Sequence, residues 1–354
     1  MKQFFSHKTP VFAGEDVLPF LKEKLNSYQR IFLLADFRTM RKCLHVVESL
    51  INETVECHTL VIQEGERFKN INTCLLLWKQ LQQLNAHRND LIVNIGGGVV
   101  CDIGAFVAST FKRGMQFIQI PTSLMAMADA AIGGKSGVDL EMVKNQIGMF
   151  SEPEAIYIYP GFLETLDPRQ VLNGSTEIIK HALIKDAELW KKIKSLKDVP
   201  SSEEFILKSA EIKSHVINSD FKESGMRRIL NFGHTFGHAF ESYSLQHDSH
   251  PLLHGEALAM GIICESWLSM HINGFPSEAF EEIRNYIFRF YPKYNLPSSS
   301  LPELVGLMKQ DKKNIDERIN VSLLSQTGAC DFDNYCSEDD LITALNVYYD
   351  LKSR

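Results

Sequence analysis

The chain has 354 residues, which is enough for two domains of ordinary size, and 44% of them are hydrophobic while 23% are charged. These fractions predict a packed core and exclude a largely disordered chain. The formal net charge of −7 does not favour nucleic-acid binding, which usually needs a basic surface. Seven cysteines form no CxxC pair, the N-terminus lacks the apolar run of a secretion signal, and no apolar stretch could span a membrane. The composition is typical of a cytoplasmic protein.

The first part of the chain alternates strand patterns with helical ones. Strands are predicted at residues 30–36, 55–62, 90–95, 117–121 and 155–160. This alternation predicts a mostly parallel sheet with helices on both faces. After about residue 160 the strand patterns stop and apolar residues recur at the helical period. We therefore expect an α/β domain at residues 1–160 and an all-helical domain at residues 161–354, with a terminal helix at 331–354.

A glycine turn follows the strand predicted at residues 90–95. Gly96, Gly97 and Gly98 precede a helical pattern, and such a turn lets backbone amides approach a pyrophosphate at a helix N-terminus. The turn lacks the GxGxxG spacing, so a tight strand–helix turn without a ligand is the alternative. Asp36 ends the first strong strand, where ribose-binding acids often lie, but it is equally a candidate helix N-cap.

Histidines are concentrated in one part of the chain. Five of the twelve fall within 21 residues, at positions 234, 238, 247, 250 and 254. His234 and His238 are four residues apart and share one helix face, while His254 begins the next helical pattern. Two or three imidazoles with one carboxylate from another helix would form a divalent-metal site with open positions. The spacing does not decide which histidines bind the metal, although it favours the 234/238 pair.

The other two histidines of the cluster and the candidate carboxylate lie in different parts of the sequence. His247 and His250 lie in the stretch YSLQHDSH, which we expect to be a solvated loop. Glu177 and Lys180 are three residues apart and share a helix face, so Glu177 is the candidate carboxylate. For any single histidine, a hydrogen-bonded place in the core is the alternative to metal binding.

The stretch GGKS at residues 133–136 suggests a nucleotide-phosphate loop. That loop requires a glycine five residues before Gly134, and the position holds Asp129, whose carboxylate would repel a triphosphate. The sequence therefore excludes a Walker loop, and Lys135 needs another role.

Six segments together resemble one family. They are IGGGVVCD, KRGMQFIQIPTSLMAMADAAIGGKSGVD, KNQIGMF, TEIIKHALI, GMRRILNFGHTFGHAFE and LLHGEALAMG. In this order they resemble 3-dehydroquinate synthase, a sugar phosphate cyclase of the shikimate pathway, over roughly residues 30–320. The resemblance implies an N-terminal Rossmann-like NAD-binding α/β domain and a C-terminal helical domain that binds a divalent metal, Zn²⁺ or Co²⁺.

The resemblance also assigns residues. The metal ligands would be Glu177, His234 and His254, in place of the 234/238 pair. The NAD site would comprise Asp36, Glu66, Lys69, Gly96, Gly97, Gly98, Asp102, Thr122, Ser123 and Lys144. The substrate pocket would comprise Asp129, Lys135, Lys144, Asn145, Lys180, Lys213, Arg227, Asn231, His238 and Lys312. Lys135 would then bind a substrate phosphate.

The implied substrate is 3-deoxy-D-arabino-heptulosonate 7-phosphate. NAD⁺ would oxidise its C5 alcohol, phosphate would leave by elimination, the hydride would return, and ring opening with an intramolecular aldol step would form the carbocycle. Cationic side chains suit a substrate that carries a phosphate and a carboxylate. A second copy of the chain is also implied, because Arg113 would reach across a two-fold dimer; the sequence alone makes it an exposed turn residue.

Three alternatives remain at this point. They are a metal-dependent polyol dehydrogenase, another sugar phosphate cyclase that makes an inosose or a valiolone, and a non-enzymatic protein that keeps the fold. A polyol site has no use for the cations Lys135, Lys180, Lys213 and Arg227, whose unpaired burial would be costly. Three positions depart from the family pattern: Cys101 replaces a glycine, Asp36-Phe37-Arg38 replaces an Asp-x-Asn pattern, and STEIIK replaces a more apolar lead-in.

Overall fold

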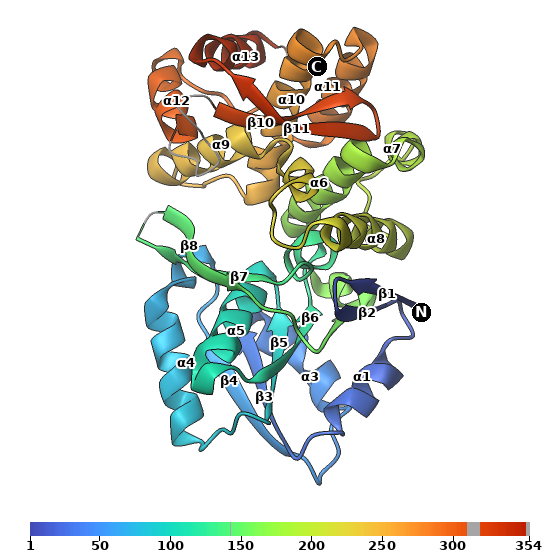
Figure 1. The fold of residues 1–354 in the computed structure, drawn as a ribbon, viewed down its shortest axis with the longest axis vertical. Helices are drawn as coiled ribbons and strands as arrows, with labels where there is room; N and C mark the ends of the chain where they lie inside the picture. Colours follow the sequence, from blue (N-terminus) through green and yellow to red (C-terminus); the bar gives the residue numbers. More distant parts are fainter. Residues whose placement is uncertain (142, 310–318, 352–354) are drawn as a thin grey trace. The chain divides into compact units, whose positions relative to one another are not determined.

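The computed structural model describes residues 1–141, 143–309 and 319–351, and the chain forms two compact units (Figure 1). Unit 1 comprises Met1–Val171 and Ser201–Phe221, and unit 2 comprises Leu172–Pro200 and Lys222–Arg354. The sequence predicted one division at residue 160. In the structure the chain instead divides inside helix α6 (Pro168–Lys185), and helix α8 (Glu203–Ser219) returns to unit 1.

Unit 1 is built on a seven-stranded sheet with the strand order β1-β2-β9-β6-β5-β3-β4. Its strands are β1 (Lys2–Ser6), β2 (Thr9–Ala13), β3 (Arg30–Asp36), β4 (Glu56–Ile62), β5 (Leu91–Gly96), β6 (Gln116–Pro121) and β9 (Ala155–Ile158). Every neighbouring pair is parallel except β1 with β2. The mostly parallel sheet is thus confirmed, although the sequence did not predict β1 and β2.

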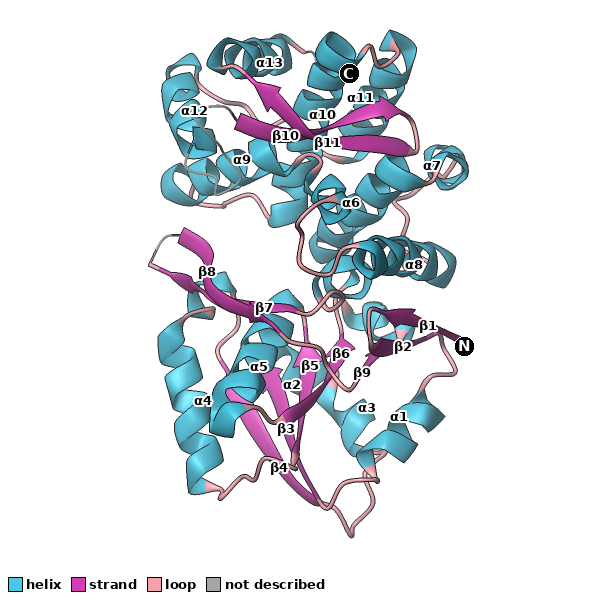
Figure 2. Ribbon diagram, in the orientation of Figure 1, coloured by secondary structure: helices cyan, strands magenta, loops and turns pink. Residues whose placement is uncertain are grey.

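Helices cover both faces of this sheet. They are α1 (Leu18–Leu25), α2 (Phe37–Lys42), α3 (Leu44–Glu48), α4 (Ile71–Gln83) and α5 (Gly98–Thr110). Figure 2 shows α4 and α5 on one side of the strands and α1 and α3 on the other. Strands buried on two faces have nearly continuous apolar sequences, and all six residues of β5 are buried. The core on the α4–α5 side includes Phe32, Leu77 and Ile103.

The GGKS stretch lies in a second, small sheet of unit 1. Strands β7 (Lys135–Leu140) and β8 (Val143–Phe150) pair antiparallel outside the main sheet. Lys135 begins β7, whereas the lysine of a Walker loop opens a helix. The structure therefore confirms that this stretch is not a Walker loop.

Unit 2 is mostly helical and is organised around one buried helix. Its helices after α6 are α7 (Ala187–Lys194), α9 (His234–His247), α10 (His254–Asn273), α11 (Ser277–Phe290), α12 (Leu301–Lys309) and α13 (Glu338–Asp350). Residues Gly255–Cys264 of α10 are buried except Glu256, as expected for a helix surrounded by protein. Among the described residues, no helix combines the length and the apolar character needed to cross a membrane.

The expectation that the second half is all-helical is wrong in one place. Strands β10 (Ile319–Gln326) and β11 (Ala329–Cys336) form an antiparallel hairpin, so residues 331–336 are strand and only Glu338–Asp350 is the expected terminal helix. The stretch of β11 carries Asp331, Asp333 and Asn334, which disfavour strands in isolation. Tertiary contacts supply what local propensity lacks, since Asp333 accepts hydrogen bonds from Arg228 and Asn320.

Replacing Gly104 of α5 by alanine tests how closely α5 packs on the sheet. The added Cβ would lie 1.9 Å from Oδ1 of Asn94, which is fully buried in β5. We expect Gly104→Ala to lower the free energy of unfolding by about 1–3 kcal/mol, measured by urea denaturation, because the overpacked helix must move.

Gly306 in α12 provides the matched control. Among the described residues, and apart from the backbone of its own helix and its two chain neighbours, no atom lies within 4 Å of a Cβ added there. Gly306→Ala should therefore stabilise the protein by about 0.5–1 kcal/mol through its better helix propensity. Equal stabilities of the two variants would show that α5 does not pack closely on β5.

Candidate active site

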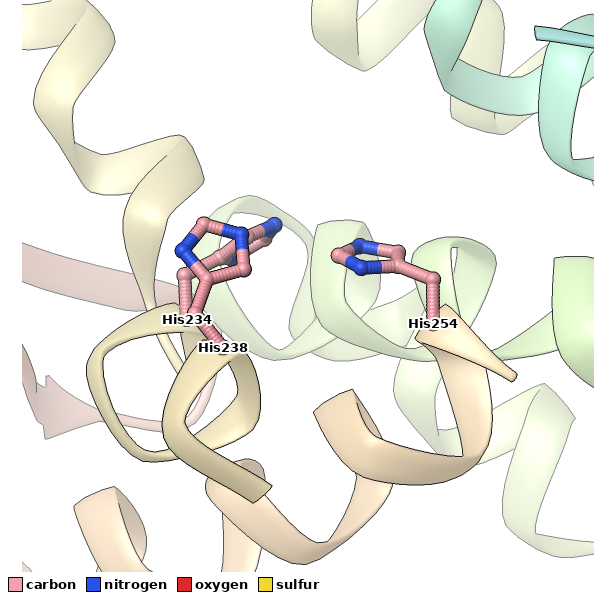
Figure 3. Close-up of side chains that lie close together, drawn as sticks. All are labelled: His234, His238 and His254. Atoms are coloured by element: carbon pink, nitrogen blue, oxygen red, sulfur yellow. The ribbon is translucent and has the colours of Figure 1, made fainter. Parts of the chain in front are cut away.

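Three histidines of unit 2 converge from two helices. His234 and His238 lie in the first two turns of α9, and His254 is the first residue of α10. One ring nitrogen of each lies within 4.8 Å of the others. Figure 3 shows the ring of His254 pointing across toward the two rings of α9. The sequence placed His234 and His238 on one helical pattern and His254 on the next, and the structure brings all three together.

Glu177 of α6 supplies a carboxylate to this cluster. Its Oε1 atom lies 3.7 Å from Nε2 of His234 and 3.7 Å from Nε2 of His254. Its Oε2 atom forms a salt bridge with Nζ of Lys180, one turn further along α6. Both side chains are almost completely buried, so the expected helix face shared by Glu177 and Lys180 is a buried one.

The outer ring nitrogens of two histidines have acceptors of their own. Nδ1 of His234 donates to the carbonyl oxygen of Phe232 at 3.3 Å, and Nδ1 of His254 donates to Oε2 of Glu241 at 3.1 Å. Burial alone would lower the pKa of His254, but the carboxylates of Glu241 and Glu177 outweigh it and raise this pKa to about 9. With a cation present, both rings would offer Nε2, the arrangement usual for metal-bound histidines.

The donor set fits a divalent cation. Tetrahedral ligands at 2.0–2.1 Å from Zn²⁺ lie about 3.4 Å apart, close to the two 3.7 Å separations around Oε1 of Glu177. This geometry supports Glu177, His234 and His254 as the ligands. The 234/238 pair favoured by spacing lies near the same point, because one ring nitrogen of His238 is within 4.8 Å of one in each of the other two histidines.

The remaining histidines of the cluster region lie elsewhere. His247 is the last residue of α9, so the stretch expected as a loop is partly helical; its Nε2 atom contacts Glu303 at 2.8 Å. His250 is exposed in the connection to α10. Their exposure agrees with the expectation that both are solvated.

Other residues expected to bind substrate lie just before α9. Arg227 and Asn231 belong to the short helix η5 (Met226–Asn231), and the side chain of Arg227 is only 2% exposed. Nδ2 of Asn231 donates to Oε1 of Glu223 at 3.0 Å. Sequence reasoning missed Glu223 and Glu241. Glu241 could have been found, because it follows His234 by seven residues and therefore shares its helix face.

In unit 1, several of the residues expected to bind NAD lie at the carboxyl ends of adjacent parallel strands. Asp36 ends β3, the glycine turn ends β5, and Thr122 follows β6, with its N–H donating to the carbonyl oxygen of Gly96 at 3.0 Å. Ligands of open parallel sheets bind at such strand ends. Cys101 is buried behind this turn, and its Sγ atom lies 3.7 Å from the same carbonyl oxygen.

Asp36 also caps a helix, as its alternative interpretation predicted. Oδ1 of Asp36 accepts from the backbone N–H of Thr39 at 2.7 Å and from Oγ1 of the same residue at 3.0 Å. This capping box begins α2.

A buried ion pair lies beside the glycine turn. Nζ of Lys69 contacts Oδ2 of Asp102 at 2.6 Å and donates to Oδ1 of Asn145 at 2.7 Å. Burial would lower the pKa of Lys69, but the carboxylates of Asp102 and Glu66 raise it above its ordinary value. Lys144 lies 3.5 Å from Glu66. The structure thus joins five of the expected residues in one polar cluster.

Asp129 and Lys213 form a second polar pair of unit 1. Asp129 lies in the π-helical turn η3 (Ala126–Ala130), and Nζ of Lys213 contacts both its carbonyl oxygen at 2.6 Å and its Oδ1 atom at 2.7 Å. Isolated π-helical turns are frequent at functional sites. Lys135 is exposed at the start of β7, and Arg113 is exposed in a turn with φ of 62°. Lys312 lies outside the described residues.

Solved structures of two other enzymes share this fold. The fold is shared with the structure of 2-deoxy-scyllo-inosose synthase complexed with carbaglucose-6-phosphate, NAD⁺ and Co²⁺, with a TM-score of 0.84 and 23% identity over 97% of this chain and 98% of that one. It is also shared with 2-epi-5-epi-valiolone synthase from Streptomyces hygroscopicus, with NAD⁺ and Zn²⁺ bound, at a TM-score of 0.85 and 23% identity over 98% of both chains. The chain therefore shares the fold of these two synthases.

Sequence comparison identifies the family. The model of the 3-dehydroquinate synthase N-terminal domain matches residues 59–173, and that of the C-terminal domain matches residues 174–314. A 3-dehydroquinate synthase from Parabacteroides distasonis is 37% identical over 345 residues, covering 96% of this chain and 97% of that protein. The chain belongs to the 3-dehydroquinate synthase family.

Metal content of histidine variants tests which residues bind a cation. We expect His254→Ala to lose Zn²⁺ at equilibrium, because it removes one of the two nitrogens near Oε1 of Glu177. His238→Ala is the matched variant from the same cluster and should keep stoichiometric metal, measured by atomic emission after dialysis. The opposite result, with metal lost only from His238→Ala, would assign the site to the 234/238 pair.

Proposed function

We propose that this protein is a 3-dehydroquinate synthase that converts 3-deoxy-D-arabino-heptulosonate 7-phosphate to 3-dehydroquinate and phosphate. One observation carries the proposal: Oε1 of Glu177 lies 3.7 Å from Nε2 of both His234 and His254, in a chain that matches both domain models of the family. Relatives named for this activity cover nearly the whole chain, as in the Parabacteroides distasonis protein.

The proposed cofactors are NAD and a divalent cation, Zn²⁺ or Co²⁺. We assign NAD to the strand ends of unit 1, where the N-terminus of α5 and the glycine turn suit a pyrophosphate. The residues assigned to it are Asp36, Glu66, Lys69, Gly96, Gly97, Gly98, Asp102, Thr122, Ser123 and Lys144. A cation held by Glu177, His234 and His254 would supply Lewis-acid polarisation of the reacting C5 oxygen.

Charge explains the residues assigned to the substrate. A phosphate and a carboxylate on one small molecule need several cationic donors, and charge-assisted hydrogen bonds to them are the strong ones. The residues assigned are Arg113, Asp129, Lys135, Lys144, Asn145, Lys180, Lys213, Arg227, Asn231, His238 and Lys312. Lys180 has three N–H donors, so it can keep its salt bridge with Glu177 and still donate to a substrate hydroxyl.

A reconstituted assay tests the function. The protein, Zn²⁺, catalytic NAD⁺ and the heptulosonate phosphate should release one phosphate per carbocycle formed, without net NADH, because the hydride leaves and returns within one turnover. NADH accumulating at ~340 nm in step with substrate consumption would indicate a dehydrogenase. Phosphate release from a hexose or heptose phosphate, but not from the heptulosonate, would indicate a different sugar phosphate cyclase.

The proposed assembly is a homodimer in which Arg113 acts on the neighbouring subunit. Arg113 is exposed in a turn after α5, and a two-fold interface would let each subunit donate one arginine and receive one. Subunits with Arg113→Ala and subunits with His254→Ala, each nearly inactive alone, should complement when mixed. Random exchange makes half of the dimers mixed, each with one intact site, so about a quarter of wild-type activity should return.

Subunit exchange must be verified in the same experiment by mass spectrometry of differently tagged chains. If exchange occurs and no activity returns, Arg113 acts within its own subunit or not at all, and the assignment in trans is wrong.

A further inference from the structure

The two histidines assigned to the metal occupy the same position in their helices. His234 follows the N-cap Gly233 of α9, and His254 follows the N-cap Leu253 of α10. The first N–H groups of a helix have no partner within it, and an N-cap side chain usually accepts from one of them. Glycine and leucine have no side-chain acceptor. Both helices therefore begin without an N-cap side chain that accepts a hydrogen bond, although Glu256 in the first turn of α10 accepts from the N–H of Leu253 at 2.8 Å.

Neighbouring helices supply the missing caps. The N–H of Thr235 donates to Oε1 of Glu265 at 3.0 Å, and the N–H of Gly233 donates to Oε2 of Glu265 at 2.7 Å. The N–H of Gly255 donates to Oδ1 of Asn173 at 2.6 Å. These N–H groups flank the two histidines, because Gly233 and Thr235 enclose His234 and Gly255 follows His254.

The cap of α9 cannot come from residue 233 itself. Gly233 has φ of 83°, and a Cβ there would lie 2.7 Å from Cγ1 of Ile262 and 2.9 Å from Cδ1 of Leu258. A serine or aspartate at this position would therefore clash with α10. The same close approach brings Glu265 of α10, which is fully buried, to the first turn of α9. Close packing of α9 on α10 thus excludes an N-cap side chain at residue 233 and places the carboxylate of Glu265 where it can cap α9 instead.

The caps connect the three proposed ligands in sequence. Asn173 lies one turn before Glu177 on α6, and it fixes the start of α10 with help from Thr176, whose Oγ1 donates to the carbonyl oxygen of Gly255 at 2.9 Å. Glu265, further along α10, then fixes the start of α9. Each hydrogen bond restrains the backbone next to one ligand relative to the helix that carries another.

We infer that Asn173 and Glu265 are positioning residues that hold His254 and His234 at the separation from Glu177 that a divalent cation requires. This inference rests on the metal site of the proposed function. Removing partners one step beyond the ligands of a metal typically weakens its binding by about 10–100-fold. Asn173 and Glu265 act through backbone N–H groups, so their effect would be on ligand position and not on ligand basicity.

Three variants test this, with Zn²⁺ affinity measured by chelator competition and ligand geometry by the visible absorption of the Co²⁺-loaded protein. Asn173→Ala and Glu265→Gln should each weaken Zn²⁺ binding by about 10–100-fold and change the Co²⁺ spectrum. Ser269→Ala is the matched control. Ser269 is fully buried one turn after Glu265. Its Oγ atom donates to the carbonyl oxygen of Glu265 at 2.6 Å and accepts from the N–H of Leu324 at 2.8 Å. Its loss should lower the stability of the protein without altering the Zn²⁺ affinity or the Co²⁺ spectrum.

The difference in charge between the two residues separates position from electrostatics. Glu265→Gln removes a negative charge, which alone would weaken cation binding, whereas Asn173→Ala changes no charge. A loss of affinity in Glu265→Gln only, with an unchanged Co²⁺ spectrum, would therefore overturn the inference. Asn173→Asp keeps the acceptor oxygen, and it should bind Zn²⁺ at least as tightly as the wild-type protein.

Other outcomes are equally decisive. Wild-type affinity and spectrum in both Asn173→Ala and Glu265→Gln, or an equal change in Ser269→Ala, would show that the caps serve stability alone. If Asn173→Ala does not fold, as judged by circular dichroism, the Co²⁺ spectrum of Glu265→Gln decides, because loss of charge does not move ligands. Failure of the wild-type protein to bind stoichiometric metal would instead refute the proposed metal site.

Discussion

The buried carboxylate of Glu177 constrains everything around it. Removing a carboxylate from water costs several kcal/mol unless opposite charge and hydrogen bonds replace the solvent. Lys180 satisfies one oxygen from the next turn of the same helix, and the other oxygen faces two imidazoles of unit 2. A protonated His254, with its raised pKa, provides part of the compensating charge without a metal. A divalent cation at this point would provide it more completely, which is why the same geometry suits metal binding.

His234 and His254 lie close to Glu177 because each is the first residue of its helix. A residue in the first turn projects beyond the helix N-terminus, where the backbone N–H groups also point. The helix dipole disfavours a cation at that end by a few tenths of a kcal/mol or more. Negative charge on Glu177, Glu241 and Glu265 offsets this cost near both N-termini. In addition to their individual contacts, these three carboxylates therefore share one electrostatic effect, which is to favour a cation near the N-termini of α9 and α10.

The sequence predicted those features that depend on neighbouring residues. Strand β5 was predicted because a strand buried on both faces is continuously apolar. The histidine cluster was found from spacing within 21 residues. The hairpin β10–β11 was missed because Asp333 is stabilised by Arg228, more than a hundred residues earlier. Local patterns could not bring the proposed ligands together either, since Glu177 precedes His234 by more than fifty residues and only packing of α6, α9 and α10 joins them.

Asp36 shows that structural and functional interpretations of one residue need not compete. The hydrogen bonds that cap α2 both use Oδ1, whereas a carboxylate has a second oxygen with its own lone pairs. Capping fixes the rotamer of Asp36 at the end of β3, where an open parallel sheet binds its ligands. A ribose-binding acid gains from such restraint, because less side-chain entropy is lost when the ligand arrives. Glu265 of unit 2 is a second example, because it caps α9 through the N–H groups of Gly233 and Thr235 and so restrains the backbone that carries His234.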